Sequence, residues 1–198
     1  MDGRTGAVPA GAVRSLAGTD GGGPGGLRPV PGDARPAPVR GTGGERARRP
    51  GEGAWPLFSG LGPVAALPTA PGLARAFTVM VLSGWGLAAM TDTGTLIVSE
   101  FAANVVRAAE GPGGSPAYDE KGRMPVLWLR LTADAALLGI EVWDSLPPES
   151  GVPVLRHADP DAERGRGLGI VAALSQAWGW EPVPARRVKR TWAVVAIS

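Results

Sequence analysis

The sequence predicts an α/β domain in which helices cover one face of a mostly antiparallel sheet, a two-layer sandwich. Two segments with helical spacing of apolar residues precede two strand-like segments, and only two alanines separate those strands. A third helix-like segment and a final strand-like run, residues 191–198, complete the chain. Roughly 140 residues take part, which is enough for one hydrophobic core.

Residues 1–54 are predicted to lie outside that core. They hold 15 of the 31 glycines and seven of the 20 prolines, with eight arginines against five acidic residues. Few large apolar side chains are present to offset the entropic cost of ordering the chain. We therefore expect a disordered Gly/Pro/Arg-rich extension over residues 1–54 and a folded domain over residues 55–198.

Composition narrows the classes of function. The chain has no cysteine and a single histidine, His157, which excludes disulfides, thiolate metal sites and multi-histidine metal sites. The arginines of the extension are scattered among Gly and Pro without interleaved aromatic residues, so direct nucleic-acid binding is not expected. The longest uncharged runs are broken by prolines or are too short to span a bilayer. We expect a cytoplasmic protein that does not enter a membrane.

Two helices are predicted before the strands. In residues 71–85 the apolar spacing of Leu73, Phe77, Met80 and Val81 predicts a core-facing stripe, and glycines end the helix near Trp85. The second helix, residues 92–110, is predicted to start with a capping aspartate at its first residue. Its apolar stripe contains Ile97, Phe101, Val105 and Ala108.

The second half alternates strands, a loop and a helix. Residues 126–134 and 137–144 are predicted strands joined as a hairpin. The next twenty residues contain four prolines, which favours a long functional loop. A third helix is predicted to open at the glycine run near Gly167 and to end near Gly179.

Three groups of residues suit chemistry, and each also has a purely structural interpretation. Glu100 and Asn104 stand one turn apart on the second helix, where a carboxylate can accept a proton and an amide oxygen can bind Mg²⁺, or where both are simply solvated. Asp144 ends an apolar strand, where it can accept a hydrogen bond from a ligand amine or form a turn.

The third group is a glycine run that opens the third helix. Gly165, Gly167 and Gly169 let the backbone approach an anion at a helix N-terminus, and Arg164 and Arg166 add positive charge. The run lacks the last glycine of the dinucleotide-binding motif and the Lys-Ser/Thr of the P-loop. A tight turn is the alternative interpretation.

The order of these groups resembles the histidine-kinase-like ATPase superfamily (GHKL, Bergerat type), and within it the small actinobacterial proteins related to anti-sigma factor serine/threonine kinases. "LIVSEFAANVVRAA" resembles the N box, "IEVWD" the first glycine box, and "DPDAERGRGLGIVAALSQAWGW" the second. The resemblance implies a Bergerat fold with ATP and Mg²⁺ as ligands. The first glycine box departs from the superfamily pattern because "SLPPE" follows Asp144, and Ala108 stands where relatives usually have histidine.

The resemblance also implies roles for individual residues. Glu100 would orient or deprotonate the hydroxyl of a protein substrate, Asn104 would ligate Mg²⁺, and Asp144 would bind the adenine amino group with support from Thr191. The phosphates would lie against Gly165, Arg166, Gly167, Leu168 and Gly169.

Two functions follow from the resemblance. The first is a serine/threonine kinase that phosphorylates a small anti-sigma antagonist protein. The second is an ATP-binding module that sequesters a sigma factor or another partner with little or no turnover. A homodimer is compatible with either function.

Overall fold

The computed structural model describes residues 49, 55–111, 114–119, 121–147, 150 and 167–197. The predicted extension, residues 1–54, lies outside this part of the chain except for Arg49. The described elements are, in chain order, β1 (Leu57–Ala65), α1 (Ala70–Gly84), α2 (Thr91–Ala109), β2 (Val126–Ala133), β3 (Leu137–Asp144), α3 (Gly167–Leu174), β4 (Ala177–Val183) and β5 (Val188–Ala196).

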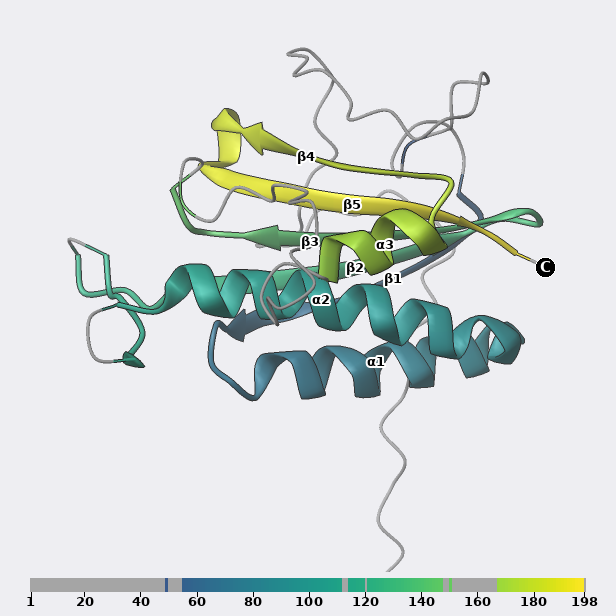
Figure 1. The fold of residues 1–198 in the computed structure, drawn as a ribbon, viewed down its shortest axis with the longest axis horizontal. Coiled ribbons are helices and arrows are strands. Elements are labelled where there is room, and N and C mark those ends of the chain that lie inside the picture. Colours follow the sequence, from purple (N-terminus) through teal and green to yellow (C-terminus); the bar gives the residue numbers. More distant parts are fainter. Residues whose placement is uncertain are drawn as a thin grey trace, which may run out of the picture. The chain divides into compact units, whose positions relative to one another are not determined.

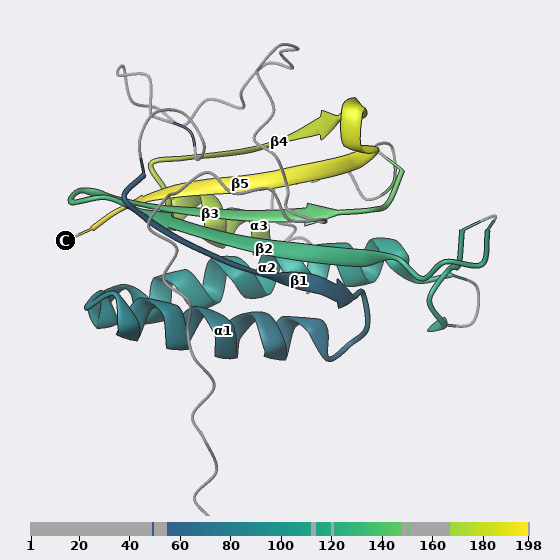
Figure 2. The ribbon, with the colours of Figure 1, turned by 180° about the vertical axis from the view of Figure 1, so that it is seen from behind.

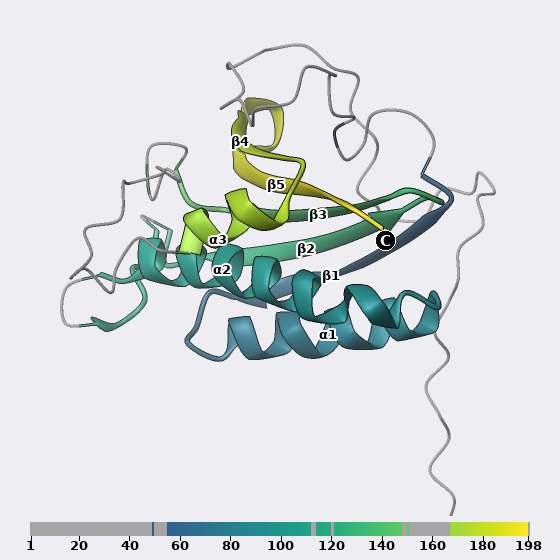
Figure 3. The same cartoon turned by 45° about the vertical axis from the view of Figure 1, so that its right-hand side comes forward.

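The strands form one sheet in the order β1-β2-β3-β5-β4, and every neighbouring pair is antiparallel. All three helices lie on the same side of this sheet, with α1 beside α2 and α3 above α2 (Figures 1 and 3). Figure 2 shows the sheet from the opposite side, which we call the helix-free face. The prediction of helices on one face of an antiparallel sheet is confirmed.

The central hairpin, β2 and β3, is built as the sequence predicts. Its register pairs Leu127 with Asp144 at one end and Ala133 with Leu138 at the other. Asp134 closes the turn, because its carboxylate accepts hydrogen bonds from the backbone N–H groups of Ala136 and Leu137, each at 2.8 Å. Such aspartate-centred turns satisfy backbone donors that the strands leave unpaired.

The core lies between the sheet and α2. Alternate residues of each strand point towards the helices, as the two-residue period of a strand requires. The following core residues of α2, β2 and β3 are all at most 1% exposed: Ile97, Val98, Phe101, Ala102, Leu127, Leu129, Leu131, Ala133, Leu138, Ile140 and Val142. The stripe predicted for the second helix is therefore confirmed, with Val105 buried and Ala108 packed at its edge.

The predicted stripe of the first helix is wrong in part. Leu73 and Met80 are 52% and 53% exposed, and Phe77 is half-buried. The helix buries Val81 of the predicted stripe and, outside it, Ala74, Thr78 and Leu82, on the side that packs beside α2. Helical spacing identified the element but not the side that faces the core.

The predicted cap of the second helix is also wrong. A 3₁₀ turn, Ala88–Met90, leads directly into α2, so Met90 occupies the cap position and makes no side-chain capping bond. Asp92 lies within the first turn. Its charge there still favours the helix, because the N-terminal end of a helix carries partial positive charge.

Both edges of the sheet differ from the sequence prediction. The third helix ends at Leu174, and residues 177–183 form edge strand β4, where the prediction continued the helix towards Gly179. Strand β1 was not predicted, because its glycines and proline argue against a strand. Edge strands tolerate such residues, and β1 has a register shift between Leu61 and Val64. The last strand begins at Val188, three residues before the predicted start.

We expect Phe101→Ala to lower the free energy of unfolding by about 3–5 kcal/mol, because it leaves a large cavity under the sheet. Leu96→Ala, on the same helix but 48% exposed, should change it by no more than about 0.5 kcal/mol. Urea denaturation of both variants measures the difference. Equal losses would contradict the placement of α2.

Candidate functional site

The first residue of α3 lies against the carboxylate of Glu100. A Cβ atom added at Gly167 would stand 1.8 Å from Glu100 Oε2 and 2.5 Å from its Cδ. An added Cβ would displace the Glu100 side chain, so glycine at this position permits the close approach of the α3 backbone to that carboxylate. The structure thus brings together two predicted site residues that are far apart in the sequence.

Asn104 lies one helical turn beyond Glu100 and is half-buried. Its Oδ1 accepts a hydrogen bond from the Arg107 guanidinium, one turn further along. Its Nδ2 is buried and has no hydrogen-bond partner within the described part of the chain. A buried amide donor without a partner is costly, and a bound ligand is one way to satisfy it.

The residues after Gly167 have different surroundings. Leu168 is only 7% exposed and belongs to the core, so it anchors the start of α3. A Cβ at Gly169 would meet no atom within 4 Å. Gly165 and Arg166, which complete the predicted phosphate cradle, lie outside the described residues.

Asp144 ends β3 on the face covered by helices, as Leu138, Ile140 and Val142 precede it at alternate positions. Its side chain is completely buried. Oδ1 accepts a hydrogen bond of 3.1 Å from the backbone N–H of Leu146. Oδ2 faces the Lys189 ammonium across 3.5 Å and has no hydrogen-bond partner among the described residues.

Lys189 is the site residue that sequence reasoning missed. It stands opposite Asp144 in the β3–β5 register, is 2% exposed, and donates a hydrogen bond of 2.6 Å to the Ser150 carbonyl oxygen. One signal was available: the chain has only two lysines among its 20 basic residues, and this one lies in an apolar strand. Its pairing with Asp144, however, depends on strand register.

Thr191 lies on the same face of β5, two residues beyond Lys189, and is 5% exposed. It pairs with Val142, which places it diagonally across the sheet from Asp144. Diagonal neighbours of this kind lie about 7–8 Å apart. Asp144, Lys189 and Thr191 therefore form one polar cluster on an otherwise apolar sheet face.

Burial raises the pKa of Asp144 from 3.8 to about 6, although the Lys189 ammonium and the Leu146 N–H both act to lower it. The folded protein therefore holds this proton more tightly than the unfolded chain does. The stability that Asp144 contributes is fully present below about pH 4 and is lost as the pH rises through about 6.

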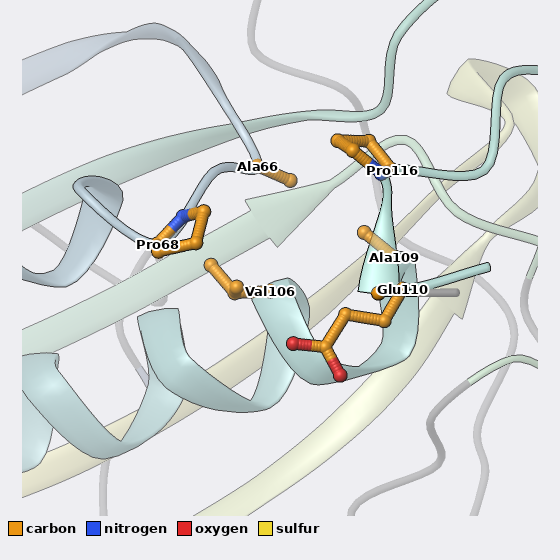
Figure 4. Close-up of a pocket in the computed structure, with 7 residues that line it drawn as sticks. Ala66, Pro68, Val106, Ala109, Glu110 and Pro116 are labelled. Carbon is orange, nitrogen blue, oxygen red and sulfur yellow. The ribbon is translucent and has the colours of Figure 1, made fainter. Parts of the chain in front are cut away.

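A small surface pocket lies elsewhere, where the end of α2 meets the connection between β1 and α1 (Figure 4). None of the predicted site residues lines it. Its only charged lining residue is Glu110, and its other lining residues are Ala66, Pro68, Val106, Ala109, Gly114 and Pro116. It offers little polar chemistry to a ligand.

Comparison with protein-family models found no match for this chain, and comparison with curated proteins found none. Within the described residues, no helix is both long enough and apolar enough to cross a membrane. The same residues contain no cluster of three or more His, Cys, Asp or Glu side chains suited to a metal ion.

We expect Lys189→Met to raise the pKa of Asp144 above 6, because the substitution removes the positive charge that favours its carboxylate. A carboxyl-carbon NMR titration of the full chain measures this pKa. Lys121→Met, which removes the other lysine at an exposed position, should leave it at about 6. An unchanged value in Lys189→Met would contradict the ion pair.

Proposed function

We propose that this domain has the Bergerat ATP-binding fold and binds ATP together with Mg²⁺. The observation that carries the proposal is the contact between the Gly167 backbone and the Glu100 carboxylate. This contact brings the glycine run, which could bind phosphates, next to α2. That helix carries Glu100 and Asn104, the two residues proposed to act in phosphoryl transfer. A simple turn into a helix does not require this contact.

The residues present fit the proposed ligand at both of its ends. At the base end, Asp144 offers a buried carboxylate oxygen that can accept a hydrogen bond from an exocyclic amino group. Thr191 lies nearby with a hydroxyl group. At the phosphate end, Asn104 offers a buried amide without a partner among the described residues.

The start of α3 supplies the remaining feature. The first backbone N–H groups of a helix have no partner within the helix, and they favour an anion at that end. Leu168 fixes the position of this end in the core. Gly167 adds no side chain of its own on the side that faces α2, where the Glu100 carboxylate lies.

We further propose that the protein is a serine/threonine kinase of the anti-sigma factor type. Bound Mg²⁺ would neutralise phosphate charge, and phosphoryl transfer otherwise needs mainly positioning. Glu100 would accept a hydrogen bond from the hydroxyl group of a small antagonist protein and so orient it. Because Gly167 bears no side chain, that carboxylate can stand directly beside the phosphate end of the site.

The second candidate is a module that binds ATP and sequesters a sigma factor or another partner without turnover. One observation favours it: the chain's own cations engage both ligand-facing groups, Arg107 at Asn104 and Lys189 at Asp144. A ligand has to displace or share these contacts. Slow exchange of the ligand fits that arrangement better than rapid turnover does.

We expect the full chain to bind ATP in a Mg²⁺-dependent manner, as measured by titration calorimetry. Gly167→Ala should weaken binding at least tenfold, because its methyl group displaces the Glu100 carboxylate. Gly84→Ala adds the same methyl group in open space on α1, away from the candidate site, and should change binding less than threefold. Asn104→Ala should remove most of the Mg²⁺ dependence.

No ATP binding by the unmodified protein at millimolar ATP would overturn the proposed function. Equal effects of the two glycine substitutions would show that the contact with Glu100 is not part of the site.

We expect Glu100→Gln to abolish phosphorylation of a cognate antagonist protein while ATP affinity stays within about threefold. Glutamine keeps the size of the side chain but cannot accept a proton from the hydroxyl group. Transfer of radioactive phosphate from ATP measures the activity. If the unmodified protein transfers no phosphate yet binds ATP and its partner, the sequestering module is the correct function.

A further inference from the structure

The helix-free face of the sheet carries an ordered row of charges. Strand alternation places Arg130 of β2, Glu141 of β3, Arg190 of β5 and Glu181 of β4 on this face, and we call these four residues the charged ladder. Arg130 and Arg190 both pair with Glu141, the latter at 2.8 Å, and Arg190 also pairs with Glu181. The signs alternate across four neighbouring strands.

One tryptophan, Trp143, contacts both arginines of the ladder. The guanidinium carbons of Arg130 and Arg190 lie 5.6 Å and 5.4 Å from the ring centre of Trp143. Such cation–π contacts hold both arginines flat over the sheet. The ladder is therefore a rigid surface of fixed charge pattern.

Part of this face is more deeply buried than a sheet surface without helices should be. An antiparallel sheet commonly has one solvated face. Here Glu141 and Val194 are fully buried and Trp192 is only 3% exposed, although no described helix lies over them. Side chains cover this part of β3 and β5: Arg130 and Arg190 lie against Glu141, and a further arginine lies over Trp192.

The further arginine is Arg49. Its guanidinium carbon lies 5.2 Å from the ring centre of Trp192, and its Nη1 lies 3.5 Å from Glu181 Oε2. Its side chain is 23% exposed. Arg49 thus adds one further positive charge to the ladder, between Trp192 and Glu181.

Arg49 and the start of β1 lie near opposite edges of the sheet. Arg49 lies at β4 and β5, whereas β1, which starts only eight residues later at Leu57, is the opposite edge strand. Four strand spacings amount to about 19 Å, and eight extended residues reach at most about 29 Å. The chain length is therefore compatible with Arg49 and Leu57 both belonging to the same copy of the chain.

We propose that the segment preceding β1 docks in cis on the helix-free face, with Arg49 bound by Trp192 and Glu181 as its anchor. The face accepts an extended, arginine-bearing segment because it offers an aromatic surface beside a carboxylate. The Arg-rich extension supplies that residue type within the same chain. The anchor lies on the side of the sheet away from Asp144 and Glu100.

Limited proteolysis of the full chain tests this docking. A glutamate-specific protease cleaves after Glu52, three residues beyond the anchor, and mass spectrometry follows that product. Arg49→Ala should speed this cleavage about tenfold, because cleavage tracks the open population of the segment. Arg48→Ala, which removes the neighbouring positive charge, should leave the rate within twofold.

A double-mutant cycle then tests the partner. Glu181→Gln should speed cleavage as well, and combining it with Arg49→Ala should add little, because both changes break one contact. A synthetic peptide of residues 45–60, with and without the arginine change, controls for protease preference and should be cleaved at one rate.

Three results would overturn the proposal. One is equal cleavage of the Arg49→Ala and Arg48→Ala proteins. Another is full additivity of the Arg49 and Glu181 substitutions. The third is a cleavage rate that falls as protein concentration rises, because that would assign the contact to a second copy of the chain. None of these measurements depends on ATP, so the docking and the proposed ATP site can fail independently.

Discussion

The packing of α2 against the hairpin of β2 and β3 is the interaction on which the rest of the structure depends. Ile97, Phe101 and the leucines of β2 exclude water from the centre of the domain, and burial of apolar area is the main term that stabilises such a fold. The same helix carries Glu100 and Asn104 at the border of its buried stripe. The geometry of the candidate site is therefore set by the core, since neither residue can move without moving α2.

Strand β3 carries two buried carboxylates, Glu141 and Asp144, whose surroundings differ. Asp144 and Glu141 are three residues apart, so they point to opposite faces. Glu141 is paired with two arginines, whereas Asp144 has a single lysine and one oxygen without a hydrogen bond among the described residues. Fully satisfied buried charges serve structure, and incompletely satisfied ones are more often found at functional sites. This contrast supports placing the ligand on the helix-covered face and the docked segment on the other.

The two proposals also explain why the domain has charged groups on both sides of one sheet. An enclosed carboxylate beside an apolar helix layer suits a base that must be recognised away from water. A flat row of arginines, glutamates and tryptophans suits an extended segment held by side-chain contacts. These contacts have to offset the entropic cost of ordering that segment. Neither surface requires the other to form, because different residues of β3 and β5 build them.

The sequence by itself determined the α/β class, the second helix, the central hairpin and the identity of most candidate site residues. Those features depend on local periodicity and on turn residues such as Asp134, which act over a few positions. Tertiary structure decided the rest. Packing beside α2 decided which residues of the first helix are buried, and β1 and β4 are edge strands, where glycine and proline are tolerated. Strand register placed Lys189 beside Asp144, and the packing of α3 on α2 brought Gly167 against Glu100. Contacts of this kind join segments that are distant in the sequence, so they produce no periodic pattern from which they could be predicted.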